Sequence, residues 1–562
     1  MFRSKPPQMK TLPPLAASLV IRLCAGLAVA AAPFLRAGTA TFNLTSASID
    51  EVNTAIAAGA LNSEKLTRLF LNRIAAYEKA GPRLHAIITL NPRAINEARA
   101  LDEEREARGP RGPLHGIPVL LKDNMDAVGL PTTGGFYGLR NSIPNRDSEQ
   151  ACRLRAAGCI ILGKANLSEF ASGAALSTLG GQILNPHALD HTPRGSSGGS
   201  GVGVAAGFTM FALGTDTGGS IRRPSAATGI VGLKPTYGLN GRGGIIPLAL
   251  SLDTVGPMAR HVADVAVVLN EMAGPDSRDP ATKDVSIRRV PDYTAGLKAG
   301  ALKGARFGLL RDWMKLDPGV DAVIETAVAV LRNRGAEVVD IKLPRYVLGL
   351  SGGLYDAIHD TEFHYQIESY LATLPREDQN TPRTIEDVIN LVERIAEPTP
   401  EGWVPNPSRL ASLKRQARSG TLQDVPYQDA LHEARKIVRD NLTWILDREK
   451  LDAFIVPTSS TPPGLIAAEA TGAVAVRPSP TLAGSVDQVS NITGWPDLVV
   501  PAGFTGDPAL PVGLSFIGPA FSEARLLGYG YAFETALPAR RLPVYTPVLP
   551  GEIFDYETSA KK

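Results

Sequence analysis

Two clusters of glycine and serine lie close together in the chain and constrain its fold more than any other feature. The first spans 195–201 and the second 217–220, and a run of small apolar residues and a strand-like segment, 209–213, separate them. The apolar run suits a tightly packed helix, whose free N-terminal N–H groups favour negative charge. The glycines of the second cluster let a carbonyl group approach the backbone amides closely, as an oxyanion hole requires. Either cluster alone is more typical of a turn, but two of them so close together are hard to explain as unrelated turns.

Four motifs occur in a fixed order along the chain. They are Val119-Leu120-Leu121-Lys122-Asp123-Asn124, Gly195-Ser196-Ser197-Gly198-Gly199-Ser200, Asp216-Thr217-Gly218-Gly219-Ser220-Ile221-Arg222-Arg223-Pro224 and Gly232-Leu233-Lys234-Pro235-Thr236. In residue type and order they resemble the amidase signature family. The resemblance covers 49–280 and resumes in Asn491-Ile492-Thr493-Gly494-Trp495-Pro496 and in 513–518, whereas 345–435 contains no motif that we can place.

The resemblance implies both a fold and a division of the chain. The fold would be α/β, with a single large mixed β-sheet covered by helices on both faces. The amidase domain would span 41–550, with a helical insert at about 345–435 near the substrate entrance and a tail at 551–562. Length alone would suggest several domains, but the resemblance favours one large domain.

The resemblance also implies a role for each motif residue. Ser220 would be the nucleophile, Lys122 the base, and Ser196 the bridging serine that follows a cis peptide bond, Gly195–Ser196. The oxyanion donors would be the backbone amides of Thr217, Gly218, Gly219 and Ser220. The implied reaction is hydrolysis of an amide through a Ser220 acyl-enzyme, with no metal and no cofactor, as in stand-alone or peptide amidases.

Lys122 needs an argument of its own, because a lysine at a strand end is usually solvated. A buried lysine without a close counter-ion loses its proton more easily, since desolvation disfavours the charged form. Asp123 would point to the opposite face of the strand and leave Lys122 unpaired. Asp216 is expected to brace the second cluster as an acceptor, and Arg222 to orient the substrate or the loop.

Other interpretations of the glycine-rich segment are less well supported. Residues 195–199 satisfy G-x-S-x-G and would make Ser197 an esterase nucleophile, but the preceding His191-Thr192-Pro193-Arg194 is not a strand. A phosphate-binding loop is disfavoured because no GK[ST] follows the glycines. The eight histidines show no H-E-x-x-H pattern, although His191 remains a second candidate for the base because it lies near the first cluster.

Within the family, the alternative to a free-standing hydrolase is the amidase subunit of a tRNA-dependent amidotransferase, which works in the cytosol with partner chains. The helical stretch 345–435 and the N-terminus both favour the free-standing enzyme. The stretch is rich in aromatic side chains, some of which we expect to belong to the core and others to the substrate entrance, since binding pockets are largely apolar: Tyr346, Tyr355, Phe363, Tyr365, Tyr370, Trp403 and Tyr427.

Residues 1–40 have the layout of a signal peptide. They carry five basic side chains and no acidic one, then an apolar run at 23–35, and end in Ala37-Gly38-Thr39-Ala40. The apolar run is too short to span a bilayer unaided. We therefore expect export to the periplasm or medium, with cleavage after Ala40 favoured over Ala37.

The charge of the chain limits the classes of molecule that it is expected to bind. The chain has a net charge of +2, so removal of 1–40 would leave −3, and no basic stripe or known binding module indicates nucleic acid. We expect a small-molecule or peptide amide substrate, no nucleic acid, no stable membrane span, and a monomer or homodimer.

Cys152 and Cys159 are expected to be buried free thiols, because seven helical residues would separate them by about 10 Å, too far for a disulfide.

Hydrophobic patterns predict alternating helices and strands. Helices are expected over 48–59, 63–80 and 92–107, with Ser63 and Asn91 as caps. Strands are expected over 85–90, 117–121, 160–162, 306–310, 337–343, 453–456, 498–500 and 512–517. Such alternation indicates a sheet with helices on its faces.

Overall fold

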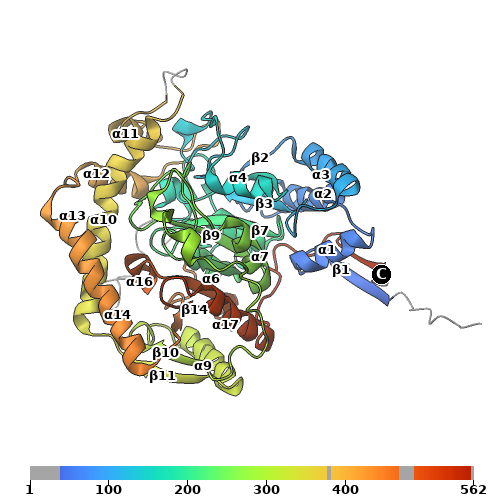
Figure 1. Ribbon diagram of the computed structural model, residues 1–562. Coiled ribbons are helices and arrows are strands. Elements are labelled where there is room, and N and C mark those ends of the chain that lie inside the picture. The colour runs from blue at the N-terminus through green and yellow to red at the C-terminus, as the bar shows by residue number, and fades with distance from the viewer. Residues whose placement is uncertain (1–37, 376–380, 467–485, 559–562) are drawn as a thin grey trace, which may run out of the picture.

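The computed structural model describes residues 38–375, 381–466 and 486–558. Its core is one 11-stranded mixed sheet (Figure 1). From one edge to the other, the strands are β11 (Glu337–Ile341), β10 (Arg306–Leu310), β12 (Ala453–Pro457), β14 (Leu510–Ile517), β13 (Asp497–Thr505), β8 (Val231–Lys234), β9 (Thr254–Ala259), β7 (Phe211–Asp216), β3 (Pro118–Lys122), β4 (Ile160–Ala165) and β2 (Ile87–Leu90). The pairs β11–β10, β10–β12, β7–β3 and β3–β4 are parallel, and the remaining pairs are antiparallel.

Helices cover both faces of this sheet. Every residue of β3, β4, β7 and β12 is buried, as expected of strands with helices on each side. Alternate residues of β13 face opposite layers: a Cβ on Gly530 of α17 would meet Leu498 and Val500, whereas one on Gly513 would meet Val499 and Ala226 of α6. The predicted fold class is therefore confirmed.

Helices make up a large part of the rest of the described chain. Their bounds are α1 (Ile49–Ala57), α2 (Ser63–Ile74), α3 (Ala94–Arg108), α4 (Glu149–Ala156), α5 (Gly198–Ala205), α6 (Arg222–Thr228), α7 (Val262–Met272), α8 (Val285–Arg288), α9 (Pro318–Asn333), α10 (Arg345–Leu371), α11 (Ile385–Glu393), α12 (Pro407–Ala417), α13 (Val425–Asp429), α14 (Arg435–Glu449), α16 (Val486–Thr493) and α17 (Glu523–Ala536). Two π-helical segments, Ala75–Lys79 and Ala430–Ala434, extend α2 and join α13 to α14. A two-stranded ribbon pairs β5 (Leu176–Ser177) with β6 (Gly181–Gln182). No helix of the described residues is long and apolar enough to cross a membrane.

The small residues of the first glycine cluster allow α5 to lie against the sheet. A Cβ on Gly199 would come within 2.3 Å of the Asn166 carbonyl oxygen and 2.4 Å of that of Ala86. One on Gly203 would come within 2.7 Å of the Leu120 side chain in β3. Any larger residue at these positions would push the helix away, so the glycines fix where the adjoining serines lie.

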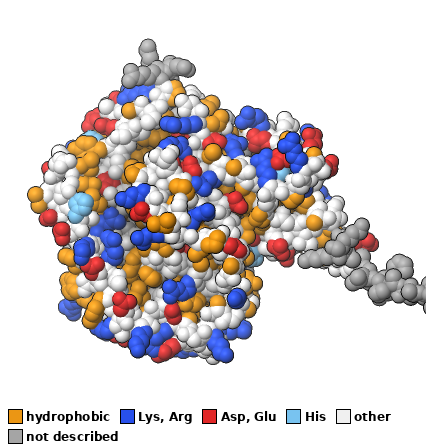
Figure 2. Space-filling model, viewed as in Figure 1, with side chains coloured by type: hydrophobic (Ala, Val, Ile, Leu, Met, Phe, Trp, Pro, Cys, Tyr) orange, Lys and Arg blue, Asp and Glu red, His pale blue; other side chains and the backbone are white. Residues whose placement is uncertain are grey.

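Helices α10 to α14 form an outer layer at the left of Figure 1. The helical character predicted for 345–435 is confirmed, and the layer continues to Glu449 at the end of α14. Phe363, Tyr370 and Tyr427 are buried, whereas Tyr346 is exposed. Basic and acidic side chains are interspersed with hydrophobic ones over the face shown in Figure 2.

The two ends of the described chain form a ribbon of their own. Strand β1 (Gly38–Asn43) pairs antiparallel with β15 (Ile553–Thr558), from Gly38 opposite Thr558 to Asn43 opposite Ile553 (Figure 1). The expectation that 551–562 is only a tail is therefore wrong for β15, because backbone pairing with β1 orders it. The prediction for 1–40 falls mainly on 1–37, which lie outside the described residues.

Three local predictions need correction. The cap of α2 is Asn62, whose side chain accepts the Lys65 N–H at 2.8 Å, and Ser63 is the first helical residue. Asn91 accepts the Arg93 N–H at 2.9 Å, just before α3 begins, and so acts next to the cap position. Cys152 is exposed on α4 rather than buried, whereas Cys159 lies beyond the helix end and is buried.

Candidate active site

Sheet register brings the lysine motif to the second glycine cluster. Strands β3 and β7 are parallel neighbours, with Leu121 opposite Leu213, and end at Lys122 and Asp216. Parallel strands have their carboxyl ends at the same sheet edge, where open α/β sheets place their ligands. The loop 217–220 begins at this edge and leads directly into α6.

Lys122 is fully buried and hydrogen-bonded to neutral oxygens. Its Nζ lies 2.7 Å from Ser196 Oγ, 2.7 Å from Thr215 Oγ1 and 3.4 Å from the Thr215 carbonyl oxygen. The neighbouring Asp123 pairs instead with buried Lys164 at 3.0 Å, as its position on the strand predicts. Burial lowers the pKa of Lys122 to about 7, although the more distant carboxylates of Asp216 and Asp253 oppose this shift. The amine is therefore able to accept a proton near neutral pH.

The two motif serines lie on adjoining loops. The Gly195–Ser196 peptide bond is cis. Ser196 is held from behind by the Ser168 N–H, which donates to its carbonyl oxygen at 3.0 Å, and the Ser197 N–H donates to the Ser220 carbonyl oxygen at 3.1 Å. Among the described residues the Ser220 hydroxyl has no hydrogen-bond partner, so its link to Ser196 is not formed in this conformation. Catalytic hydrogen bonds are often long before substrate binds.

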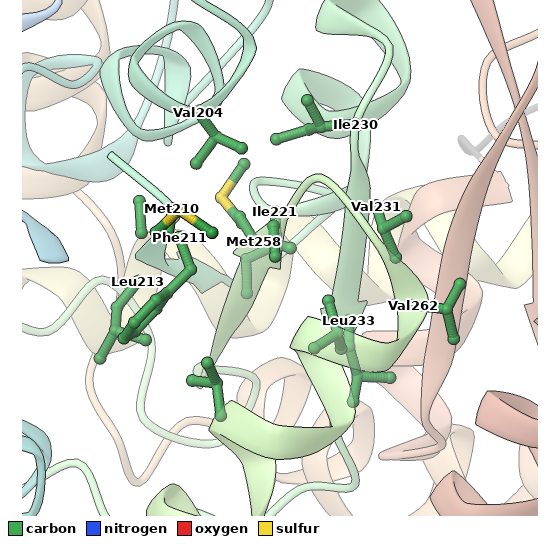
Figure 3. Packing of buried hydrophobic residues seen from close by; sticks show 14 of the residues in the cluster. Val204, Met210, Phe211, Leu213, Ile221, Ile230, Val231, Leu233, Met258 and Val262 are labelled. Carbon is green, nitrogen blue, oxygen red and sulfur yellow. The ribbon is translucent and has the colours of Figure 1, made fainter. Parts of the chain in front are cut away.

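The packed core fixes the far end of the nucleophile loop. Ile221, the residue after Ser220, is buried in a cluster with Met258 of β9 and Val231 and Leu233 of β8 (Figure 3). Gly219 has φ of 107°, a conformation that side chains rarely adopt. The turn that presents Ser220 therefore depends on glycine before it and on apolar packing after it.

The structure changes the expected set of oxyanion donors. The Gly219 N–H donates to Asp216 Oδ1 at 2.8 Å and is already used. In the part of the chain that the structure describes, the amides of Thr217, Gly218 and Ser220 form no hydrogen bond. These three remain available to a developing oxyanion, and the prediction that Gly219 also donates is wrong for this conformation.

Asp216 braces this loop, as predicted. Besides Gly219, its carboxylate accepts the Ile221 N–H at 2.9 Å and the Arg222 guanidinium at 3.1 Å. Burial alone would raise the pKa of Asp216, but Arg222 and the loop amides hold it below its ordinary value. Asp216 is thus an anion that organises the loop and is no proton donor.

Arg222 lies in the interior and links the loop to the C-terminal motif. Its guanidinium donates to Asn491 Oδ1 at 2.7 Å and to Asp497 Oδ2 at 2.8 Å. Lys234, from the fourth motif, donates to the carbonyl oxygen of Trp495 at 2.8 Å. Motifs that are far apart in the sequence therefore meet behind the loop. Arg222 was expected to orient either the substrate or the loop, and its contacts agree with the second of these roles.

Three side chains at the site were not assigned to it from the sequence, although Tyr355 is among the aromatic residues expected in the core or at the substrate entrance. Thr215 provides the second oxygen on Lys122, and buried Asp253 accepts the Thr217 hydroxyl together with the amides of Leu248 and Ala249. Tyr355, from α10, lies against Gly218. Thr215 could have been found as the neighbour of Asp216, whereas the other two come from segments without a recognisable motif. A small cavity beside the loop is lined by Asn124, Ala171, Thr215, Thr217, Asp253 and Leu248, among others.

Ser197 and His191, the alternative candidates for nucleophile and base, have side chains that are hydrogen-bonded to other groups. Ser197 Oγ donates to the Thr215 carbonyl oxygen at 3.1 Å, and the residue stands at the start of α5. His191 Nδ1 lies 2.6 Å from Asp190 Oδ1. Neither side chain is hydrogen-bonded to the other catalytic candidates among the described residues. Within the same residues, no group of three or more His, Cys, Asp and Glu side chains could hold a metal ion.

Comparison with known proteins agrees with this geometry. The Amidase family model matches residues 65–527, including the middle segment in which we found no motif. The chain therefore belongs to the Amidase family, whose members cleave or transfer amide C–N bonds.

Two kinds of relative stand out. The sequence of the chain is 38% identical to that of native peptide amidase from Stenotrophomonas maltophilia. Its structure matches the X-ray structure of that enzyme with a TM-score of 0.79, over 89% of this chain and 99% of that one. The chain is also 37% identical to a glutamyl-tRNA(Gln) amidotransferase subunit from Chloroflexus aggregans, over 86% of this chain and 95% of the relative. The solved structure of the corresponding glutamyl-tRNA(Gln) amidotransferase subunit from Thermotoga maritima matches with 26% identity and a TM-score of 0.66, over 89% of this chain and 98% of that one.

Proposed function

We propose that this chain is a free-standing amide hydrolase that acts on small or peptide amides through a Ser220 acyl-enzyme. The observation that carries the proposal is the hydrogen bond of 2.7 Å from buried Lys122 to Ser196, at the sheet edge where the Ser220 loop begins. A lysine with lowered pKa and no carboxylate partner next to a serine is what a base for serine activation requires.

The arrangement of the two serines, the lysine and the loop amides assigns each of them a step in amide hydrolysis. Ser220 Oγ attacks the amide carbonyl carbon while its proton passes to Ser196, whose own proton passes to neutral Lys122. The amides of Thr217, Gly218 and Ser220 stabilise the resulting oxyanion. When the C–N bond breaks, the proton returns through Ser196 to the leaving nitrogen. Water then attacks the acyl-enzyme by the same relay and releases the carboxylic acid.

A second candidate is the amidase subunit of a tRNA-dependent amidotransferase. Curated relatives that are glutamyl-tRNA(Gln) amidotransferase subunits, 37% and 38% identical over most of their length, favour it. The higher TM-score and identity of the peptide amidase, compared with the solved amidotransferase subunit, support the free-standing hydrolase. The two candidates differ in substrate and in the need for partner chains.

An amide panel distinguishes these candidates. We expect the purified chain alone to release ammonia from N-acetyl-phenylalaninamide and to form the acyl-hydroxamate when hydroxylamine replaces water, because both nucleophiles attack one acyl-enzyme. Glutamine is the comparison substrate. Hydrolysis of glutamine only, and only with partner subunits added, would identify the amidotransferase subunit instead.

We also propose that the protein is exported and acts as a monomer or homodimer, without nucleic acid. Cleavage after Ala40 would leave Thr41–Asn43 of β1 to pair with β15, whereas cleavage after Ala37 would leave the whole strand. Intact-mass analysis of protein from the native host should give an N-terminus near Thr41. Recovery from the cytosol of a chain that starts at Met1 or Met9 would contradict export and favour the amidotransferase subunit.

A further inference from the structure

Tyr355 fills the space directly over Gly218 in the nucleophile loop. A Cβ built on Gly218 would lie 2.7 Å from the Tyr355 hydroxyl oxygen and 2.8 Å from two of its ring carbons, and these are the three nearest atoms. The φ of Gly218 is not among the positive values, unlike that of Gly219. The φ angle at this position is therefore compatible with alanine, and the nearest obstacle to its methyl group is the Tyr355 side chain.

The other groups of the loop are held by different partners. The Gly218 carbonyl oxygen accepts from Arg223 Nη2 at 2.6 Å, and the Gly219 N–H is bound by Asp216. The Thr217 hydroxyl donates to Asp253. The Gly218 peptide is thus fixed at its carbonyl and covered by Tyr355, while its N–H remains open to a ligand.

The tyrosine ring is itself held in place within α10. It stacks on His359, one turn later, with 5.2 Å between ring centroids and an angle of 20° between the planes. Leu354 and Ile358 on the same helix are buried in the cluster that joins α10 to α14 and the sheet. No described residue accepts a hydrogen bond from the Tyr355 hydroxyl, so the end of the tyrosine side chain meets the loop through van der Waals contact.

We propose that Tyr355 is a positioning residue that presses on Gly218 and thereby holds its N–H in line for the oxyanion. This inference rests on the proposed amide hydrolysis. It gives the helical layer at 345–435 a role in catalysis, because α10 supplies the side chain that covers Gly218 in the loop 217–220. Oxyanion donors act only when they are fixed in advance, and a displacement of about 1 Å is able to cost about 10²-fold in rate.

Steric complementation tests the contact. With N-acetyl-phenylalaninamide as substrate, Gly218→Ala should lower kcat about 10²-fold, because its new methyl group collides with the ring. Tyr355→Ala should also lower kcat, by about tenfold, with KM nearly unchanged. The double variant should be at least about tenfold more active than Gly218→Ala, since the removed ring makes room for the methyl group. A double variant no better than Gly218→Ala, with losses that simply multiply, would overturn the proposal.

Companion variants separate positioning from other roles. Tyr355→Phe keeps the ring and should retain kcat within about threefold, while Tyr346→Ala, at the exposed start of the same helix, is the matched control. The aldehyde N-acetyl-phenylalaninal, whose adduct carries an oxyanion, should bind Tyr355→Ala more weakly by the same factor as kcat falls. A rise in KM with kcat unchanged would instead assign Tyr355 to substrate binding and overturn the proposal.

Two further measurements keep the outcome interpretable. Thermal unfolding should show that Tyr355→Ala is folded, and Tyr355→Leu, which fills more of the space, replaces it if it is not. Ser220→Ala assayed in parallel reports on the proposed function itself. An inactive Ser220→Ala beside a fully active Tyr355→Ala would reject the positioning role while leaving the hydrolase intact.

Discussion

Replacing Ser220 by alanine should lower kcat/KM for a hydrolysed amide by about 10⁴-fold or more, because the variant lacks the atom that attacks the carbonyl carbon. The loop amides and Lys122 remain, so a small residual rate above that in water should persist. The measurement is ammonia release under kcat/KM conditions, together with trapping of the acyl group on the intact protein by mass spectrometry. Near-normal activity in Ser220→Ala would reject the acyl-enzyme hypothesis.

The same substitution should leave stability almost unchanged. The Ser220 hydroxyl has no hydrogen-bond partner among the described residues, so its removal exposes no unsatisfied group. Ser197→Ala is the matched control, since it deletes a neighbouring hydroxyl that donates to the Thr215 carbonyl oxygen. It should retain most activity but cost about 1 kcal/mol of stability. Loss of activity in Ser197→Ala alone would favour the esterase hypothesis.

Much of the fold could be predicted from the sequence because strands buried on both faces are continuous apolar runs. The prediction for 306–310 coincides with β10, and that for 453–456 falls one residue short of β12. The strand expected over 209–213 instead runs as β7 from Phe211 to Asp216. Gly214 and Asp216 near its end are poor strand formers and are held in the strand by pairing with β9, which local propensity does not report.

The candidate site was predictable where its residues belong to motifs that resemble those of the family, and not where they come from segments without such a motif. Lys122 and Ser196 are 74 residues apart in the chain, and the family resemblance anticipated that they meet. Asp253 and Tyr355 reach the loop from segments whose sequence carries no motif. The use of the Gly219 N–H by Asp216 depends on a loop conformation that a glycine pair leaves open.

The proton relay makes the second large prediction. Lys122 must be neutral when Ser220 attacks, and burial lowers its pKa to about 7. Below that pH the amine is protonated, so kcat/KM should fall about tenfold per pH unit as the pH drops and should level off above it. Lys122→Met keeps the apolar stem but has no base. It should lose about 10³-fold or more at pH 8, and its acidic limb should flatten.

A double-substitution cycle then shows whether Lys122 and Ser196 act as one path. Ser196→Ala removes the group that passes the proton on, and should cost about as much as Lys122→Met while leaving the Gly218 and Ser220 amides in place. If the proton travels from Ser220 through Ser196 to Lys122, breaking either link stops it, so the double variant should be scarcely slower than the slower single one. Losses that multiply would show two independent contributions. An acidic limb that persists unchanged in Lys122→Met would mean that another group takes the proton, and His191→Gln would then be the variant to compare, because His191 lies near the first glycine cluster.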